Sequence, residues 1–385
     1  MVGDFRLPPL KEGPELMALR MEVRQFLKEE GDAGRFKPSS LGWAGFDPAF
    51  SKRLAVKGWI GMTWPKAYGG HERTPIERHV VTEELLSAGA PVRAHWVADR
   101  QSGPLLLKFG TEAQRQRYLP EIAKGERYFC IGMSEADSGS DLASIRTKAT
   151  QEDGGWRING AKIWTSNAHR VHTVIVFART GPAGESRHEG VSQFLVDLDQ
   201  PGISVRPIVN MAGEHDFNEV VFDNVFVSDA QVVGRIGNGW NQVTSELVYE
   251  RSGPDRWLST YQLLPHLVDK TSDMDSDVAR QGVGRLVAHL WTMHHMSLSI
   301  AGLVAQGEHP QTEAALVKEL GTQLEREIPD TARQLVPESV RLDFDQNDPF
   351  EQALRYTTLY APALTIRGGT VEILRGIIAK SLGMR

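Results

Sequence analysis

Hydrophobic residues change their spacing twice along the chain, and these changes divide it into three zones. From about Glu15 to Glu126 the apolar residues recur at the period of amphipathic helices. One helix is outlined by Leu16, Leu19, Met21, Val23, Phe26 and Leu27, and another by Ile76, Val80, Val81, Leu85 and Leu86. Thr74-Pro75 supplies an N-cap and a first-turn proline, and Thr111 with Gln114 forms a capping box for a further helix. The first zone is therefore predicted to be helical.

The middle zone, from Phe129 to about Asp229, has the pattern of short strands separated by turns. Strands are predicted at Ile145–Thr150, Gly155–Ile163, Thr173–Arg179, Ser192–Leu198, Ile203–Ile208 and Glu219–Val227. Asp153-Gly154-Gly155 and Asn159-Gly160 supply residues that accept the positive φ of tight turns. Short strands at this spacing predict a small antiparallel barrel or sandwich.

The helical period returns at Asn238 and continues to the end of the chain. Helices are predicted at Asn238–Glu250, Asp277–Val304, Thr312–Leu335, Pro349–Tyr356 and Val371–Leu382. We therefore expect an α+β multidomain protein. Its parts would be an N-terminal helical domain (1–128), a middle antiparallel β domain (129–235) and a C-terminal helix bundle (236–385).

Composition excludes several classes of protein. The length of 385 residues allows two or three domains, and the net charge of −6 gives no electrostatic case for binding nucleic acid. The single cysteine, Cys130, excludes an internal disulfide framework and favours a reducing compartment. Apolar stretches of the length of a signal peptide or membrane span are absent, so we expect a soluble, cytoplasmic protein.

Two short runs carry the most informative chemistry. Cys130–Asp141 (CIGMSEADSGSD) places small hydroxyl residues and a glycine together, and Asn159–Asn167 (NGAKIWTSN) adds an indole and another hydroxyl. Together they favour a flat aromatic cofactor that is held by amide and hydroxyl donors and backed by a tryptophan. The alternative is a pair of ordinary β-turns with a core tryptophan.

As an ordered set, the motifs resemble those of the acyl-CoA dehydrogenase family, and they cover nearly the whole chain. Besides the two runs above, they are Trp64–Gly70 (WPKAYGG), Gly110–Gln114 with Tyr118–Pro120, Asn218–Val220 with Phe222-Asp223, Val233-Gly234 with Gly237–Trp240, and Gly369–Ile373 with Arg375. The resemblance implies a helical domain, a β domain and a four-helix bundle, with FAD between the last two. It also implies α,β-dehydrogenation of an acyl-CoA thioester and reoxidation by an electron-transfer flavoprotein.

The resemblance also assigns roles to individual residues. The positions that match FAD contacts are Ile131, Met133, Ser134, Ser140, Trp164, Ser166 and Thr370, together with Glu372, where many members carry glutamine. A carboxylate cannot donate as an amide does, so the contact of Glu372 is in doubt. Ser140 is also a candidate contact to a phosphate of the substrate, and its alternative role is to cap a turn in solvent.

The catalytic base of the family is missing from its commonest place. That glutamate precedes the C-terminal Gly-Thr pair, where this chain has Gly368. Some members carry the base just before an arginine on the first helix of the C-terminal domain, and Glu250 occupies that position. Glu250 is therefore the candidate base and Arg251 a candidate substrate contact. The alternative is a Glu-Arg pair with a structural role or on a solvated helix face.

The Gly368-Gly369 pair is expected to supply the backbone amide that polarises the thioester carbonyl. Because it carries no side chains, it is also compatible with a bulky acyl group, as in lipid or steroid catabolism. A tight loop is the simpler explanation.

Two segments that hold FAD in other members are absent. One is Arg-x-x-Phe-Gly after Trp257, where Arg280-Gln281 stands in the approximate region, and the other is Gly-Gly-x-Gly-Tyr near Val336–Ser339. A partner chain in a heterotetramer would supply these contacts, and a homotetramer is the alternative.

Two other functions remain open at this point. The chain could be a non-catalytic partner subunit of a heteromeric acyl-CoA dehydrogenase, or a desulfinase or monooxygenase of the same fold. Metal binding is not expected, because the adjacent His294 and His295 point in different directions on a helix.

Overall fold

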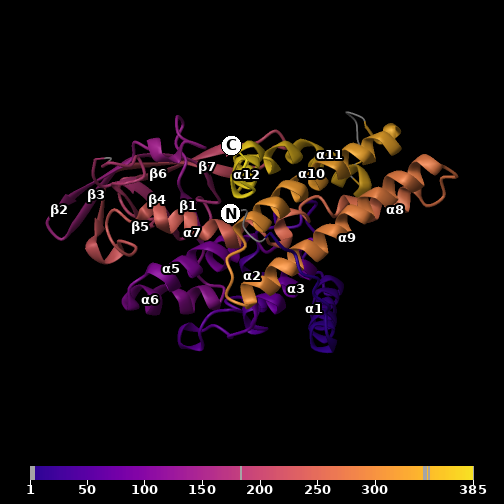
Figure 1. The fold of residues 1–385 in the computed structure, drawn as a ribbon, viewed down its shortest axis with the longest axis horizontal. Helices are drawn as coiled ribbons and strands as arrows, with labels where there is room; N and C mark the ends of the chain where they lie inside the picture. Colours follow the sequence, from indigo (N-terminus) through magenta and orange to yellow (C-terminus); the bar gives the residue numbers. More distant parts are fainter. Residues whose placement is uncertain (1–4, 183, 341–344, 346, 385) are drawn as a thin grey trace. The chain divides into compact units, whose positions relative to one another are not determined.

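A computed structural model describes residues 5–182, 184–340, 345 and 347–384, and it leaves out the side chains of residues 246–250. The chain forms two compact units. The helical unit comprises Met1–Phe50, Arg73–Arg93 and Val248–Arg385, and the sheet unit comprises Ser51–Glu72 and Ala94–Leu247. The predicted order of helices, strands and helices is confirmed (Figure 1).

The first helices begin where the sequence predicts them. Thr74 accepts a hydrogen bond from the backbone of Glu77, and Thr111 accepts one from Gln114, so both capping boxes are formed. The helices before the sheet are α1 (Pro14–Asp32), α2 (Pro48–Val56), α3 (Pro75–Ser87), α4 (Arg93–Val97), α5 (Gly103–Phe109) and α6 (Glu112–Ala123).

The sheet unit contains strands β1 (Phe129–Gly132), β2 (Lys148–Glu152), β3 (Gly155–Ser166), β4 (Thr173–Arg179), β5 (Val191–Asp197), β6 (Ile203–Val209) and β7 (His215–Ser228). The strand order is β1-β4-β2-β3-β7-β6, and β5 pairs with β4. Most pairs are antiparallel, as predicted, but β4 pairs in parallel with β1 and briefly with β2. The parallel pairs join strands that are distant in sequence, so the local pattern could not predict them.

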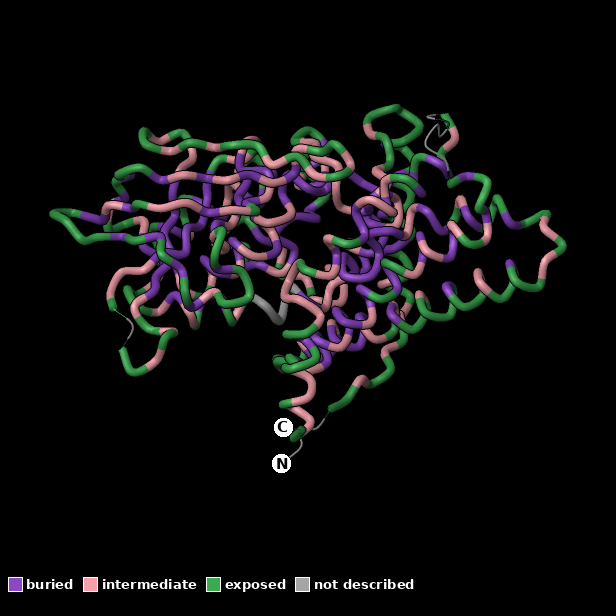
Figure 2. The backbone as a smooth tube through the Cα atoms, turned by 90° about the horizontal axis from the view of Figure 1, so that it is seen from above, coloured by how far each residue is buried: buried purple, intermediate pink, exposed green. Residues whose placement is uncertain are grey.

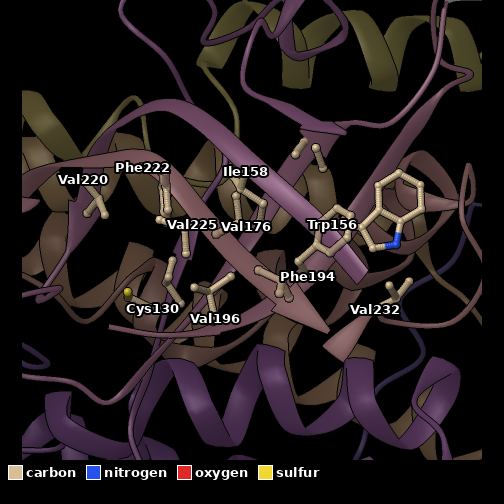
Figure 3. Packing of buried hydrophobic residues seen from close by; sticks show 14 of the residues in the cluster. Cys130, Trp156, Ile158, Val176, Phe194, Val196, Val220, Phe222, Val225 and Val232 are labelled. Carbon is tan, nitrogen blue, oxygen red and sulfur yellow. The ribbon is translucent and has the colours of Figure 1, made fainter. Parts of the chain in front are cut away.

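The larger of two described hydrophobic clusters in the sheet unit lies between its strands. Strand alternation buries Trp156 and Ile158 on β3, which pack with Phe194 on β5 and Phe222 on β7 (Figure 3). Cys130 is fully buried in the same cluster, and burial raises the pKa of its thiol. It therefore behaves as a small hydrophobic residue.

The helical unit ends in a bundle. It contains α8 (Leu263–Thr271), α9 (Asp277–Ala305), α10 (Gln311–Leu335), α11 (Pro349–Leu364) and α12 (Val371–Ser381), and α7 (Gly239–Arg251) leads into it. Helix α10 packs against α9, α11 and α12, while α3 packs against α1 and α9. Figure 2 shows buried, intermediate and exposed residues alternating along the helices, with exposed residues where one helix connects to the next. Among the described residues, no helix is long and apolar enough to cross a membrane.

Candidate active site

The structure brings together the two runs that the sequence proposes as a cofactor site. The Lys162 ammonium lies 2.9 Å from the Met133 carbonyl oxygen, and the Ile163 amide donates to the Ser134 carbonyl at 2.9 Å. The segment that leaves β1 therefore lies beside the end of β3. Ile131, Met133, Ser134 and Ser166 are all half-buried there, at the depth expected for residues that contact a ligand.

Trp164 has a strained backbone and an exposed side chain. Its φ is 59°, a value that bulky residues rarely adopt. The register between β3 and β7 shifts between Lys162 and Thr165, so a bulge turns the indole outward. The ring is 56% exposed and meets Phe217 edge to face at 5.9 Å. Strain of this kind gathers at binding sites, and an outward indole fits the backing of a flat ring.

We expect Trp164→Gly to weaken flavin binding while leaving the stability of the fold nearly unchanged. Glycine adopts positive φ without strain, which offsets the lost contact with Phe217, so the unfolding free energy of the flavin-free protein should change by less than about 1 kcal/mol. Loss of the stacking surface should weaken flavin binding about tenfold or more. Flavin titration by fluorescence measures this. Trp291→Ala is the control, because that indole is 65% exposed on α9. Equal flavin affinity in both variants would contradict the assignment.

The loop after Ser134 is held by its own hydrogen bonds. Glu135 and Ser138 exchange backbone hydrogen bonds, and the Ser138 hydroxyl donates to the Asp141 carbonyl at 2.7 Å. Ser140 is exposed, and a side chain added at Gly139 would meet nothing within 4 Å. The loop therefore leaves Ser140 accessible to a ligand, while its role as a phosphate contact stays a prediction.

Lys162 is a residue that the sequence analysis missed. Its side chain is fully buried and forms an ion pair with Glu135 at 2.8 Å. Burial lowers the pKa of Lys162 to about 8, although Glu135 opposes the shift. The period of β3 places Lys162 on the same face as the buried Trp156 and Ile158. A lysine on the core face of a strand was the signal that could have revealed it.

In the helical unit, the loop before α12 has the geometry that only glycines accept easily. Gly368 and Gly369 have φ values of 71° and 102°. The Arg251 Nε atom donates to the Gly368 carbonyl at 3.1 Å, and a Cβ on Gly369 would lie 3.4 Å from the Arg251 guanidinium. The residue that follows Glu250 thus contacts the loop where most family members carry their base. The side chain of Glu250 itself lies outside the described residues.

A buried ion pair anchors the same loop to α10. The Arg367 guanidinium donates to both carboxylate oxygens of Glu325, at 2.8 and 2.9 Å. It also donates to the Asp255 carbonyl and the Ser259 hydroxyl, each at 2.7 Å. Glu325 is fully buried and the Arg367 side chain is 19% exposed, so the pair is largely shielded from solvent and fixes the residue before Gly368.

Thr370 and Glu372 lie at the start of α12. Thr370 is the N-cap, and its hydroxyl accepts from the Ile373 amide at 3.4 Å. Glu372 is exposed, and hydrogen bonds from its own backbone amide and from Thr370 lower the pKa of its carboxyl group. The two residues therefore have a structural role at the helix start, and their contacts with FAD stay predictions.

One group of side chains in the helical unit has the composition of a metal site. Glu12, Glu83 and His294 offer ligand atoms within 4.8 Å of one another. However, the Arg20 guanidinium forms ion pairs with Glu12, Glu83 and Glu84. Burial alone would raise the pKa of Glu83, but the His294 hydrogen bond and nearby positive charges lower it to about 2. Arginine supplies the positive charge here, so we interpret the group as an ionic cluster that joins α1, α3 and α9.

The residues around β1 and β3 fit a flavin by their chemistry. Hydroxyl donors at Ser134 and Ser166 stand beside the outward indole of Trp164. Gly132 lets the Lys162 stem pack close to β1, because a Cβ there would lie 3.2 Å from that stem. The set offers hydrogen-bond donors and an aromatic face without a metal ligand, which suits a flat heterocycle.

Comparisons with known families match three successive parts of the chain. The acyl-CoA dehydrogenase N-terminal domain matches residues 13–126, the middle domain residues 130–225, and the C-terminal domain residues 268–383.

Among relatives, the acyl-CoA dehydrogenase IpdE1 of Mycolicibacterium smegmatis is 34% identical over 390 residues, covering 95% of this chain and 97% of the relative. The acyl-CoA dehydrogenase FadE34 of Mycobacterium tuberculosis is 35% identical over 330 residues, which cover 86% of this chain. The matched part spans 45% of FadE34.

Solved structures show the same architecture. The Tcur3481-Tcur3483 steroid ACAD has a TM-score of 0.86 at 28% identity and covers 97% of this chain and 99% of that chain. The ChsE4-ChsE5 complex from Mycobacterium tuberculosis has a TM-score of 0.83 at 26% identity and covers 98% of this chain and 100% of that chain.

Proposed function

Because the chain belongs to the acyl-CoA dehydrogenase family, a family of flavoprotein oxidoreductases, we propose that it uses FAD to dehydrogenate an acyl-CoA thioester between its α and β carbons. Bound FAD would supply the redox chemistry by accepting the β-hydride, and an electron-transfer flavoprotein would then remove the electrons. The work of this chain's residues is to hold the substrate, take the α-proton and stabilise the charge that develops on the thioester oxygen.

The Glu250 carboxylate would take the α-proton. The observation that carries this proposal is the contact between the Arg251 guanidinium and the Gly368 carbonyl, 3.1 Å apart. It brings the backbone of the candidate base next to the loop that holds the base in most members. A carboxylate in either backbone element then serves the same substrate carbon, which explains how Gly368 is tolerated.

The same contact supports a role for the Gly369 amide. The Gly368 carbonyl and the Gly369 N–H belong to one peptide group, and a guanidinium on the oxygen polarises the N–H. A polarised donor stabilises negative charge on the thioester oxygen more strongly. Arg251 would therefore act on the substrate through this peptide, and its direct contact with the substrate stays a prediction.

We further propose a bulky, polycyclic acyl group and a heteromeric assembly. Gly368 and Gly369 add no side-chain volume beside the thioester, and similar structures include a steroid ACAD and the ChsE4-ChsE5 complex. A partner chain would supply the FAD contacts that this sequence lacks after Trp257 and near Val336–Ser339.

A panel of acyl-CoA esters with a ferrocenium acceptor tests the function. We expect bleaching of the flavin by at least one ester, with the strongest response to polycyclic acyl groups. Unaltered acyl-CoA in single turnovers would indicate a non-catalytic subunit, and oxygen consumption or sulfite release would indicate a monooxygenase or desulfinase. Flavin content is measured in parallel with and without co-expressed neighbouring genes. Full flavin loading of the chain purified alone would contradict the heteromeric assembly.

A further inference from the structure

Lys162 is a buried charge in the middle of β3, and the reaction described above gives it no task. Its side chain has no exposed surface, and that of Glu135 is 10% exposed. Burying such a pair costs more in desolvation than an apolar pair of similar size would. A lysine and a glutamate at these positions therefore call for a reason other than stability.

Lys162 contacts the segment that directly follows β1. The ammonium donates to the Met133 carbonyl at 2.9 Å and to the Glu135 carboxylate at 2.8 Å. That carboxylate also accepts from the backbone amides of Arg146 at 2.6 Å and Thr147 at 2.9 Å. Lys162 and Glu135 thus tie β3, the end of β1 and the turn before β2 together.

The Lys162–Glu135 pair acts on the peptide group between Met133 and Ser134. The Met133 carbonyl and the Ser134 N–H belong to one peptide group, so an ammonium on the oxygen polarises the N–H. The next carbonyl, that of Ser134, is held by the Ile163 amide at 2.9 Å. The peptides on both sides of Ser134 are therefore fixed, and its amide has one orientation.

The Lys162 stem adds a packing constraint. A Cβ on Gly132 would lie 3.2 Å from the Lys162 Cγ atom, so the stem passes directly beneath β1. Burial lowers the pKa of the ammonium to about 8, which still leaves it protonated at neutral pH. The cation is thus present under the conditions in which the enzyme would work.

We propose that Lys162 and Glu135 are positioning residues for the flavin, which together orient and polarise the Ser134 peptide that faces the cofactor. The inference rests on the proposed function, because it takes Ser134 to be a flavin contact. As a pair, the two residues contribute no net charge near the flavin. Removing either one alone leaves the charge of the other uncompensated.

The test is the midpoint potential of the bound flavin in three variants. Reduced flavin carries more negative charge than oxidised flavin. Lys162→Met leaves a negative carboxylate and should disfavour reduction. Glu135→Gln removes the group that raises the pKa of Lys162, so the potentials are compared in mildly acidic buffer, where the remaining ammonium is positive and should favour reduction. We expect opposite shifts, each about a tenfold change in the ratio of reduced to oxidised flavin, which is about 30 mV for a two-electron couple. The double variant should return to the wild-type potential.

Lys148→Met is the matched control, because Lys148 lies exposed on the neighbouring strand β2 and should leave the potential unchanged. The proposal would be overturned if the midpoint potential shifted in the same direction in both single variants. It would also be overturned if both variants bound flavin and neither changed its potential. If Lys162→Met does not fold, the comparison of Glu135→Gln with the double variant tests the proposal. The proposal predicts that Glu135→Gln raises the potential and that adding Lys162→Met returns it to the wild-type value. A wild-type protein that binds flavin but is not bleached by acyl-CoA would refute the proposed function and leave this test intact.

Discussion

Glu250→Gln is expected to abolish the bleaching of bound flavin by acyl-CoA while the flavin stays bound. Glutamine has the shape of glutamate but cannot accept a proton. General bases contribute about 100-fold to 10,000-fold to such steps, so we expect the rate of bleaching to fall at least about 1,000-fold. Stopped-flow absorbance of the flavin measures the rate, and the flavin-to-protein ratio shows that the cofactor is retained.

Glu29→Gln is the control for this experiment, because Glu29 is an exposed carboxylate on α1. It should bleach at the wild-type rate. A Glu250→Gln protein that bleaches as fast as the control would end the assignment, and the base would then have to be sought on another element.

The conformation of the C-terminal loop explains why the base is not at position 368. Gly368 has a φ of 71°, and a glutamate there would have to adopt a backbone geometry that costs about 1–2 kcal/mol. The neighbouring Gly369 has a φ of 102° and faces the Arg251 guanidinium. A loop of this shape suits a close approach of its backbone to a ligand more than the support of a long side chain.

Local signals in the sequence predicted the local structure correctly. The capping boxes at Thr74 and Thr111 form between residues three positions apart, so the starts of α3 and α6 could be predicted directly from the sequence. Helix α8 was missed because Pro265 interrupts its pattern, although a proline in the first turn is tolerated. Helix α11 continues to Leu364, past the predicted end at Tyr356, and has Pro362 in its last turn.

The parts of the site that sequence could not predict depend on distant contacts. Arg251 and Gly368 are 117 residues apart, and Arg367 and Glu325 are 42 residues apart. No periodic pattern encodes such pairs. The outward turn of Trp164 likewise depends on a bulge against β7, which the alternation of β3 alone does not indicate. The resemblance named Arg251, Gly368 and Trp164 but not the contacts that hold them, and it named neither Arg367 nor Glu325 as a site residue.

Glu325→Gln should destabilise the helical unit strongly and displace the loop before α12. The substitution keeps the shape of the side chain but leaves the Arg367 cation buried without its counter-charge. Breaking a buried ion pair by removing one partner costs about 3–5 kcal/mol. Urea unfolding followed by circular dichroism measures the loss. Since Arg367 precedes Gly368, bleaching by acyl-CoA should also slow in the fraction that remains folded.

The pair between Arg285 and Glu327 provides the matched comparison, because it links α9 to the same helix α10 at 2.6 Å, with the arginine side chain 59% exposed and the glutamate side chain 22% exposed. Arg285→Met should cost less than about 1 kcal/mol, since solvent screens an exposed cation and also reaches the carboxylate that remains. Replacing both Arg367 by Met and Glu325 by Gln should recover part of the loss, because no buried charge is then left alone. Equal losses for the two pairs would mean that burial does not set the strength of the anchor, and that the loop is held by its glycine geometry and by Arg251 instead.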